Sequence, residues 1–136
     1  MLEILPFMGV NAPKAHQRVI TKLTARLYVL YESGAILYEP FPEVMIDESK
    51  TSPTPDVLLY DNENFQNVVI IEVAAAGVRK DFEKTAGLVE QYEVPEGFVY
   101  DYLRKTWRKY QLGIGEVFDK PSFCESIGYD LNEFVK

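Results

Sequence analysis

Two acidic residues, Asp56 and Glu72, have the type and spacing that could bind a divalent metal ion. Asp56 directly precedes an apolar run at residues 57–60, and Glu72 is the polar residue within a second apolar run at residues 68–73. Both runs are rich in β-branched and apolar residues, which predicts two strands. The stretch between them is polar and turn-like, which predicts that the strands form a hairpin.

The register of this hairpin decides whether the two acidic residues meet. Folding it symmetrically about Asn64 gives three opposed pairs: Tyr60 with Val68, Leu58 with Ile70, and Asp56 with Glu72. Directly opposed residues have Cβ atoms about 4.5–5.5 Å apart. Two carboxylates at that separation repel, and an apolar setting adds to the cost of ionising both. A cation between them offsets this cost, and Mg²⁺ (or Mn²⁺) binds to one or two protein carboxylates with several waters.

A lysine beside such a metal site would orient the attacking water or neutralise the transition state of phosphate hydrolysis. Lys84 follows Glu72 on the next predicted helix, and Lys80 precedes it by one helical turn, so both could project from one face. The spacing leaves a structural alternative open. In that alternative Glu72 reaches solvent at a sheet edge, and Asp56 closes a turn.

The single histidine and the single cysteine suggest less chemistry. His16 lies on the apolar stripe of the first predicted helix, where a lone histidine is more often structural than a ligand. Cys124 excludes an internal disulfide, suits a reducing cytoplasm, and is expected to be a free thiol. No Ser or Cys partner for a hydrolase triad is recognisable, and no glycine-rich phosphate loop is present.

Length and composition indicate one globular domain, residues 1–136, with 47% hydrophobic residues. No apolar run approaches the ~20 residues that span a bilayer, and the N-terminus lacks the basic region of a signal peptide. We therefore expect a cytoplasmic protein without membrane contact.

The net charge of −7 argues against a generally basic surface for nucleic acid. A local basic patch combined with a metal would still suffice for a nuclease. For the second of the two basic clusters, a solvated face is the expected role. The clusters are Arg79, Lys80 and Lys84, and then Arg104, Lys105, Arg108 and Lys109.

Periodicity and turn residues predict the elements that must position these side chains. The first helix ends before Gly34, the Pro40–Pro42 segment separates two short strands, residues 48–54 form a loop, and Pro95 and Gly97 end the second helix. The expected order is helix 14–33, strands 35–38, 44–46, 57–60 and 68–73, helix 79 or 80–92, strands 98–102 and 107–112, and a helix 131–135 capped by Asp130. This order predicts a central mixed β-sheet flanked by helices, an α/β (α+β) domain.

Six segments in order resemble the Uma-two family of restriction endonucleases, which belongs to the PD-(D/E)xK nuclease superfamily. The resemblance extends over residues 12–135. The segments are H-Q-R-V-I (16–20), P-D-V-L-L-Y (55–60), I-I-E-V (70–73), R-K-D-F-E-K (79–84), V-P-E-G-F-V-Y-D (94–101) and I-G-Y-D-L-N-E-F (127–134).

The resemblance implies a restriction-endonuclease-like fold with Asp56 and Glu72 as metal ligands. The superfamily lysine usually lies two residues after the glutamate, where this sequence has Ala74. The family carries its lysine on the following helix, which implies Lys84. Lys80 stays a candidate, because the spacing around Asp81 differs by about one residue from the family pattern.

We therefore expect a Mg²⁺-dependent endonuclease that hydrolyses DNA phosphodiester bonds, with His16 and Gln17 touching the site or the substrate. The alternative is a catalytically inactive nuclease-fold binding or assembly protein. The turn at residues 74–77 favours it, because it reads Ala-Ala-Ala-Gly where the family usually has a Ser-Pro-Ser type turn. An unrelated α/β domain with structural carboxylates is the third possibility. A homodimer is a further expectation, because twofold dimers are common.

Overall fold

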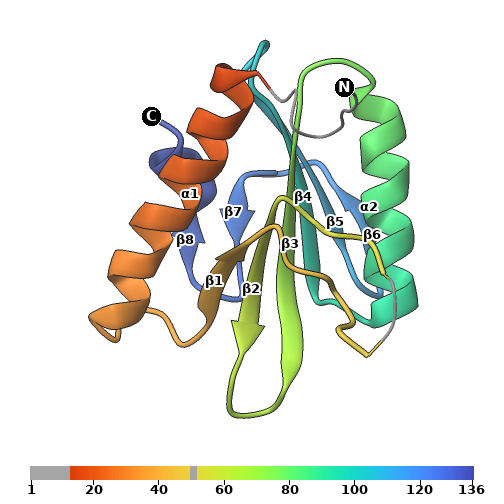
Figure 1. Ribbon diagram of the computed structural model, residues 1–136. Helices are drawn as coiled ribbons and strands as arrows, with labels where there is room; N and C mark the ends of the chain where they lie inside the picture. Colours follow the sequence, from red (N-terminus) through yellow and green to blue (C-terminus); the bar gives the residue numbers. More distant parts are fainter. Residues whose placement is uncertain (1–12, 50–51) are drawn as a thin grey trace, which may run out of the picture.

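A six-stranded mixed sheet forms the centre of the protein, with a long helix on each face (Figure 1). The computed structural model describes residues 13–49 and 52–136. The elements are α1 (Lys14–Glu32), β1 (Glu39–Pro42), β2 (Val57–Asp61), β3 (Gln66–Ala74), α2 (Val78–Tyr92), β4 (Glu96–Asp101), β5 (Thr106–Gln111), β6 (Gly115–Val117), β7 (Phe123–Cys124), β8 (Tyr129–Asp130) and the 3₁₀ helix η2 (Leu131–Phe134). The predicted α/β (α+β) architecture is confirmed.

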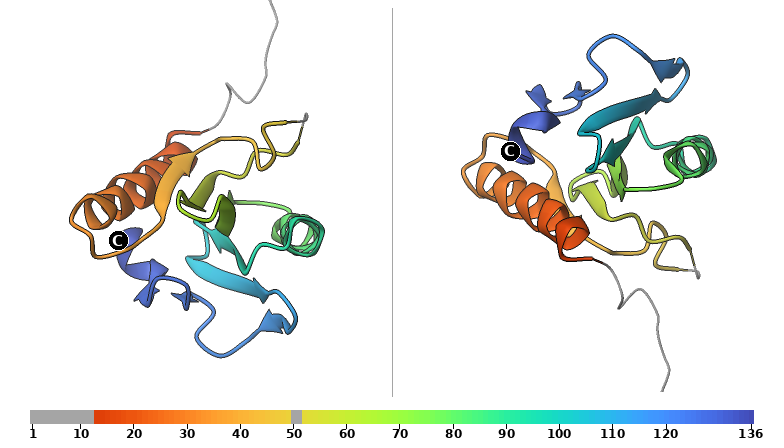
Figure 2. Two further views of the ribbon diagram at one scale, coloured as in Figure 1. Left: turned by 90° about the horizontal axis from the view of Figure 1, so that it is seen from below. Right: turned by 90° about the horizontal axis from the view of Figure 1, so that it is seen from above.

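The strands lie in the order β1-β2-β3-β4-β5-β6, and only β3 and β4 run parallel. Parallel neighbours cannot be joined by a tight turn, so the chain crosses between β3 and β4 through α2. The remaining pairs are antiparallel and follow one another along the chain. Seen along the strands, α1 and the C-terminal segment cover one face of the sheet, and α2 covers the other (Figure 2).

Alternation along the strands divides the core between these two faces. Val69, Ile71 and Val73 belong to the α1 cluster, together with Leu23 and Leu27 of that helix. Ile70, between them, belongs to the α2 cluster. Glu72 has the same parity as Ile70, so the strand period places its side chain on the α2 face.

Helix α2 lies unusually close to β4 at Gly97. A Cβ atom on Gly97 would lie 2.7 Å from Val89 Cγ2 and 2.8 Å from Thr85 Cγ2, both on α2. These distances are shorter than any ordinary contact, so the absent side chain of Gly97 sets the spacing between α2 and the sheet.

The structure corrects both strands that were expected before residue 50. Residues 35–38 and 44–46 are not strands, and β1 instead contains the proline segment that was expected to separate them. Proline is tolerated there because β1 is an edge strand that pairs only with β2. The N-terminal segment, which was expected to lack a signal peptide, lies outside the described residues. So do residues 50 and 51 of the expected loop 48–54.

The later elements were predicted more accurately, with differences at their ends. Helix α2 begins at Val78 and ends at Tyr92. The next residue, Glu93, has a left-handed backbone (φ 53°), so the helix stops before it reaches Pro95 and Gly97. The final helix is a 3₁₀ helix, and the Asp130 side chain accepts from the Asn132 N–H as expected. The strands β6, β7 and β8 were not expected, because each has only two or three residues.

A buried ion pair joins the C-terminal segment to the sheet. Lys109 Nζ lies 2.8 Å from Glu96 Oε2, and both side chains are at most 3% exposed. Glu96 also accepts hydrogen bonds from the backbone N–H groups of Glu125 and Ser126, and Lys109 donates to the Phe123 carbonyl. The expected solvated role is therefore wrong for Lys109, whose neighbours on two chain segments were not visible in the sequence.

Cys124 is buried beside this ion pair, and its thiol donates to Glu96 Oε1 at 3.4 Å. Burial and the nearby Glu96 carboxylate raise the pKa of Cys124 well above its ordinary value. The thiol is therefore inert packing, as expected for a free cysteine in a core. In the described part of the chain, no helix is long and apolar enough to cross a membrane.

Gly97→Ala should destabilise the protein by about 1–3 kcal/mol, because the new methyl group overpacks the α2 interface. Gly87→Ala is the matched control. Gly87 lies on α2 itself, and a Cβ atom there would meet nothing within 4 Å. The control should gain about 0.5–1 kcal/mol from helix propensity. Urea unfolding measures both changes. A Gly97→Ala protein as stable as the wild type would show that α2 can move away from the sheet at no cost.

Lys109→Met should cost about 3–5 kcal/mol at pH 7, because it leaves the Glu96 carboxylate buried without its cation. Burial raises the pKa of Glu96, but hydrogen bonds from Lys109, Ser126 and backbone N–H groups lower it by more. The pKa of Glu96 therefore lies below its ordinary value. This stabilisation is present above the ordinary glutamate pKa and is lost as the pH falls through the lowered one.

The difference in stability between wild type and Lys109→Met should therefore shrink in acid, which denaturant titrations from pH 7 down to about pH 3 would reveal. Glu133→Gln is the control, because its pair with Lys136 is about 60% exposed (60% and 63%) and should change stability by less than about 1 kcal/mol. An equal cost for both variants would contradict a special role for the buried pair.

Candidate active site

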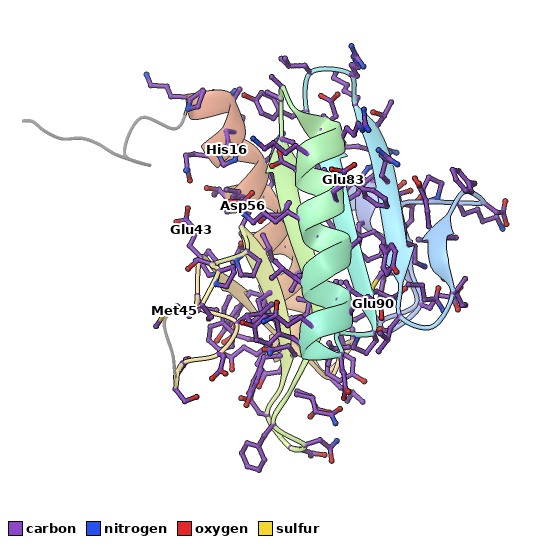
Figure 3. The ribbon with its side chains drawn as sticks, turned by 90° about the vertical axis from the view of Figure 1, so that its right-hand side faces the viewer. His16, Glu43, Met45, Asp56, Glu83 and Glu90 are labelled. Atoms are coloured by element: carbon purple, nitrogen blue, oxygen red, sulfur yellow. The ribbon has the colours of Figure 1, made fainter. Side chains whose placement is uncertain are left out.

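Asp56, Glu72, His16 and Lys84 meet at one edge of the sheet, formed by the strand ends where β3 stops and both helices begin (Figures 1 and 3). Asp56 directly precedes β2, and Glu72 lies near the end of β3. His16 lies in the first turn of α1, above Asp56 in Figure 3. Separate segments of the chain therefore supply the side chains of this edge.

Two hydrogen bonds hold Asp56 against the end of β3, one to Glu72 and one from Val73. The Asp56 backbone N–H donates to Glu72 Oε1 at 2.8 Å, and the Val73 N–H donates to Asp56 Oδ2 at 2.7 Å. The adjacent pairing of Val57 with Ile71 is the register expected for this part of the hairpin. The predicted proximity of the two carboxylates is therefore confirmed.

The register differs from the prediction nearer the turn. Leu58 pairs with Ile70 as expected, but Tyr60 pairs with Asn67 and not with Val68. The register shifts between Leu59 and Tyr60, so a bulge lies between the turn and the site.

Both carboxyl groups are held where ionisation is unfavourable. The side chains of Asp56 and Glu72 are only 19% and 10% exposed. Burial is the main cause that raises the pKa of Asp56, against lowering by the Val73 N–H and His16. Burial also raises the pKa of Glu72, and the charge of Asp56 raises it further. Ionising both groups is therefore unfavourable in the folded protein alone.

His16 contacts both the carboxylate pair and the backbone beside it. Its Nε2 lies 2.9 Å from the Val73 carbonyl oxygen and 3.6 Å from Asp56 Oδ2. Because a carbonyl can only accept, Nε2 carries a proton and donates to Val73. The ring also packs edge-on against Tyr102, with centroids 6.1 Å apart. His16 is thus a member of the site, whereas the sequence pattern alone favoured a structural residue.

Of the two candidate lysines, the structure brings only Lys84 to the carboxylates. Its Nζ lies 3.5 Å from Glu72 Oε2, and its side chain is 52% exposed. Lys80 is exposed and makes no ion pair within the described residues. Gln17 is half-buried on α1, and no hydrogen bond joins it to the other site residues in the described part of the chain.

Glu43 is a neighbour of the site that the sequence did not indicate. It lies directly after β1 with a left-handed backbone (φ 53°), and its N–H donates to the Asp56 carbonyl at 3.1 Å. Its charge also raises the pKa of Asp56, after burial as the main cause. Figure 3 shows Glu43 just below Asp56. A positive φ at a non-glycine residue was the missing signal, and it cannot be read from the sequence.

The donor set fits a hard divalent cation. The described residues contain no group of three or more His, Cys, Asp or Glu side chains that could hold a metal. Two carboxylates nevertheless meet the need of Mg²⁺, which binds one or two of them and keeps several waters. Burial is the main cause of the raised pKa values of both acids, and a bound cation would favour their ionised forms.

A separate hollow of about 580 Å³ lies near the other end of β2. Its lining includes neither Asp56 nor Glu72 nor Lys84. The candidate site therefore lies apart from this hollow. The hollow is lined by Phe41, Met45, Leu58, Tyr60, Phe65 and Tyr92, among others.

Comparison with known proteins supports this fold. No family model matches the sequence, so membership of the Uma-two family stays a prediction. No curated protein matches it either. A solved structure described as a putative nuclease belonging to DUF820, from Anabaena variabilis ATCC 29413, is similar with a TM-score of 0.67 and 14% sequence identity. The match covers 100% of this chain and 87% of that chain, so this protein has a nuclease-like fold.

Asp56→Asn should leave the metal-free protein as stable as the wild type or more stable. The asparagine Oδ1 can still accept from the Val73 N–H, and the unfavourable buried charge is removed. Because a raised pKa disfavours folding once the group ionises, the variant's advantage in Tm should grow as the pH rises above about 4. Thermal unfolding in chelator between pH 4 and 7 measures it.

Asp61→Asn is the control with the opposite sign. The pKa of Asp61 is lowered, mainly by hydrogen bonds from Asn64, so its charge favours folding. This variant should lose Tm relative to the wild type as the pH rises. A clear loss of stability in metal-free Asp56→Asn would contradict the inference that the Asp56 charge is unfavourable in the folded protein.

Proposed function

We propose that this protein is a metal-dependent endonuclease that hydrolyses DNA phosphodiester bonds. One observation supports it most strongly: the carboxylates of the half-buried Asp56 and the buried Glu72 lie together beside an exposed lysine, Lys84, at the sheet edge where both helices begin. The nuclease-like fold supports the same function. The homodimer and the cytoplasmic location expected from the sequence belong to this proposal and stay predictions.

Asp56 and Glu72 would hold Mg²⁺ or Mn²⁺. When bound, the ion supplies charge stabilisation at the scissile phosphate and lowers the pKa of water. The Val73 carbonyl faces the same side as Asp56, since His16 Nε2 lies within 3.6 Å of both oxygens. His16 thereby helps to fix the position of this backbone oxygen beside Asp56.

Lys84 supplies the cation of the protein itself. Its ammonium group, 3.5 Å from Glu72, can orient an attacking water or balance charge on the phosphate. It approaches from α2 and would take the role of the superfamily lysine, whose usual position is occupied by Ala74 in this chain. His16 and Gln17 lie at the start of α1, on the side from which a substrate would approach the carboxylates.

The distribution of charge supports a nucleic-acid substrate in spite of the net charge of −7. Both helices begin at the edge that carries the site, and helix N-termini favour anions. The turn between β4 and β5 reaches the same edge. The basic residues in the first two turns of the helices and on this turn are Lys14, Arg18, Arg79, Lys80, Lys84, Arg104 and Lys105.

A second function, binding of nucleic acid without cleavage, has one specific observation in its favour. Ala74 occupies the position of the superfamily lysine, and Lys84 lies at the long distance of 3.5 Å from Glu72. A protein with this site could keep the fold and the basic edge while lacking an effective catalytic cation. Metal binding without cleavage of any nucleic acid would identify this second function.

Calorimetric titration of Mg²⁺ and Mn²⁺ should show saturable binding to the wild type. Glu72→Gln and Asp56→Asn should each abolish it, because each removes one of two charged ligands. The same titrations of Asp81→Asn, on α2 outside the carboxylate pair, provide the matched control and should match the wild type. Retained binding in both site variants would contradict the assignment of the ligands.

Cleavage of plasmid DNA then distinguishes the two lysines. Lys84→Gln should lower the rate by about 10²-fold or more, the range of a positioned catalytic group. Lys80→Gln, one helical turn away with the same change of charge, should lower it by less than about tenfold. Equal losses in the two variants would mean that the helix contributes only general positive charge.

A further inference from the structure

The turn between β4 and β5, residues 102–105 and here called the tip loop, carries an exposed apolar side chain followed by two cations. Leu103 is 67% exposed and is followed by Arg104 and Lys105, which are also exposed. Within the described residues neither cation has a carboxylate partner. Single exposed leucines are common, so the setting of Leu103 must supply the argument.

The tip loop is held rigidly by one buried carboxylate. Asp101 is 3% exposed, and its Oδ1 accepts from the N–H groups of Leu103 at 3.0 Å and Arg104 at 3.1 Å. The Lys105 N–H donates to the Asp101 carbonyl at 2.7 Å, with Lys105 in the left-handed region (φ 58°). Leu103 is therefore presented on a fixed turn and does not lie on a loose loop.

The same turn is fastened to the candidate active site. The Tyr102 N–H donates to the Ala74 carbonyl at 3.0 Å, two residues along β3 from Glu72. The Tyr102 ring packs against His16, whose Nε2 lies 3.6 Å from Asp56. The position of Leu103 relative to the two carboxylates is thus fixed by direct contacts.

We propose that Leu103 inserts as a wedge between base steps of duplex DNA, while Arg104 and Lys105 bind the flanking phosphates. The inference rests on the proposed nuclease function and names how that site engages its substrate. Proteins that kink duplexes insert apolar side chains such as leucine between base steps and hold the backbone with cations. Single-strand binders instead use aromatic rings on which bases stack, a surface that leucine lacks.

The wedge positions the scissile phosphate. Unstacking at Leu103 bends the duplex around the tip loop and brings the backbone toward the edge where both helices begin. Because the tip loop is rigid, the step that is unstacked and the phosphate that is cleaved lie at a fixed spacing. Leu103 is a positioning residue, and it takes no part in the bond cleavage itself.

The test uses a duplex of about 25 base pairs with 2-aminopurine, in chelator so that neither metal nor cleavage enters. Fluorescence anisotropy of a labelled duplex measures affinity, and the 2-aminopurine signal reports unstacking. The wild type should bind and raise the 2-aminopurine fluorescence. Leu103→Ala should lose that rise and bind about tenfold or more weakly, since the unstacking contact is gone. Leu103→Met, which keeps an apolar wedge, should retain both.

Leu37→Ala is the matched control, because Leu37 is 76% exposed and lies outside the tip loop. It should change neither signal. Arg104→Gln and Lys105→Gln should each reduce the slope of log K against log salt by about 0.9. Lys120→Gln, at a turn position with a similar backbone (φ 49° against 58°), should leave the slope unchanged.

Four outcomes would overturn the wedge, and they separate it from the proposed function. Duplex binding without a 2-aminopurine rise, or an unchanged Leu103→Ala, would overturn it while the nuclease proposal stands. So would cleavage of single strands by a wild type that does not bind duplex. No binding and no cleavage of any nucleic acid would overturn both. Thermal unfolding of each variant shows whether a loss reflects the contact or the fold.

Discussion

The parallel pairing of β3 with β4 is the constraint on which the rest of this structure depends. It forces a crossover, and α2 supplies it by running back over the sheet from a start just beyond β3. The strand period turns Glu72 toward this helix, so Lys84 on its second turn comes to lie 3.5 Å from the carboxylate. Gly97 lets α2 pack close enough for this contact. The chemistry of the edge is thus a consequence of one strand direction.

Two buried acidic centres in one sheet show how the surroundings decide the behaviour of a carboxylate. Glu96 has a lysine and several N–H donors, so its pKa falls and its charge holds the C-terminal segment in place. Burial raises the pKa values of Asp56 and Glu72, and their smaller set of partners does not offset it. The first centre is complete within the protein. The second has fewer partners within the protein, and acids with raised pKa values in such a setting are candidates for a functional site.

How much the sequence predicts depends on how local each signal is. The hairpin, both long helices and the approach of Asp56 to Glu72 follow from alternation and helical spacing, which neighbouring residues encode. The strand β1 was missed because its prolines are acceptable only at an edge, and edges are set by the whole sheet. Lys109 was read as a surface charge because Glu96 and Phe123, its partners, come from distant segments. Glu43 depends on a backbone conformation that residue type does not predict.

The bulge between Leu59 and Tyr60 separates the two ends of the β2–β3 hairpin. On the site side, core pairs such as Leu58 with Ile70 fix the register, and on the other side the exposed turn at residues 62–65 closes it. A bulge between them absorbs a mismatch of one residue, so the length of the turn does not dictate where Asp56 meets Glu72. The turn also lies at the far end of the sheet from the site (Figure 1). It is therefore a natural place to open the chain, for a circular permutation or an inserted reporter, while the two acids stay in register.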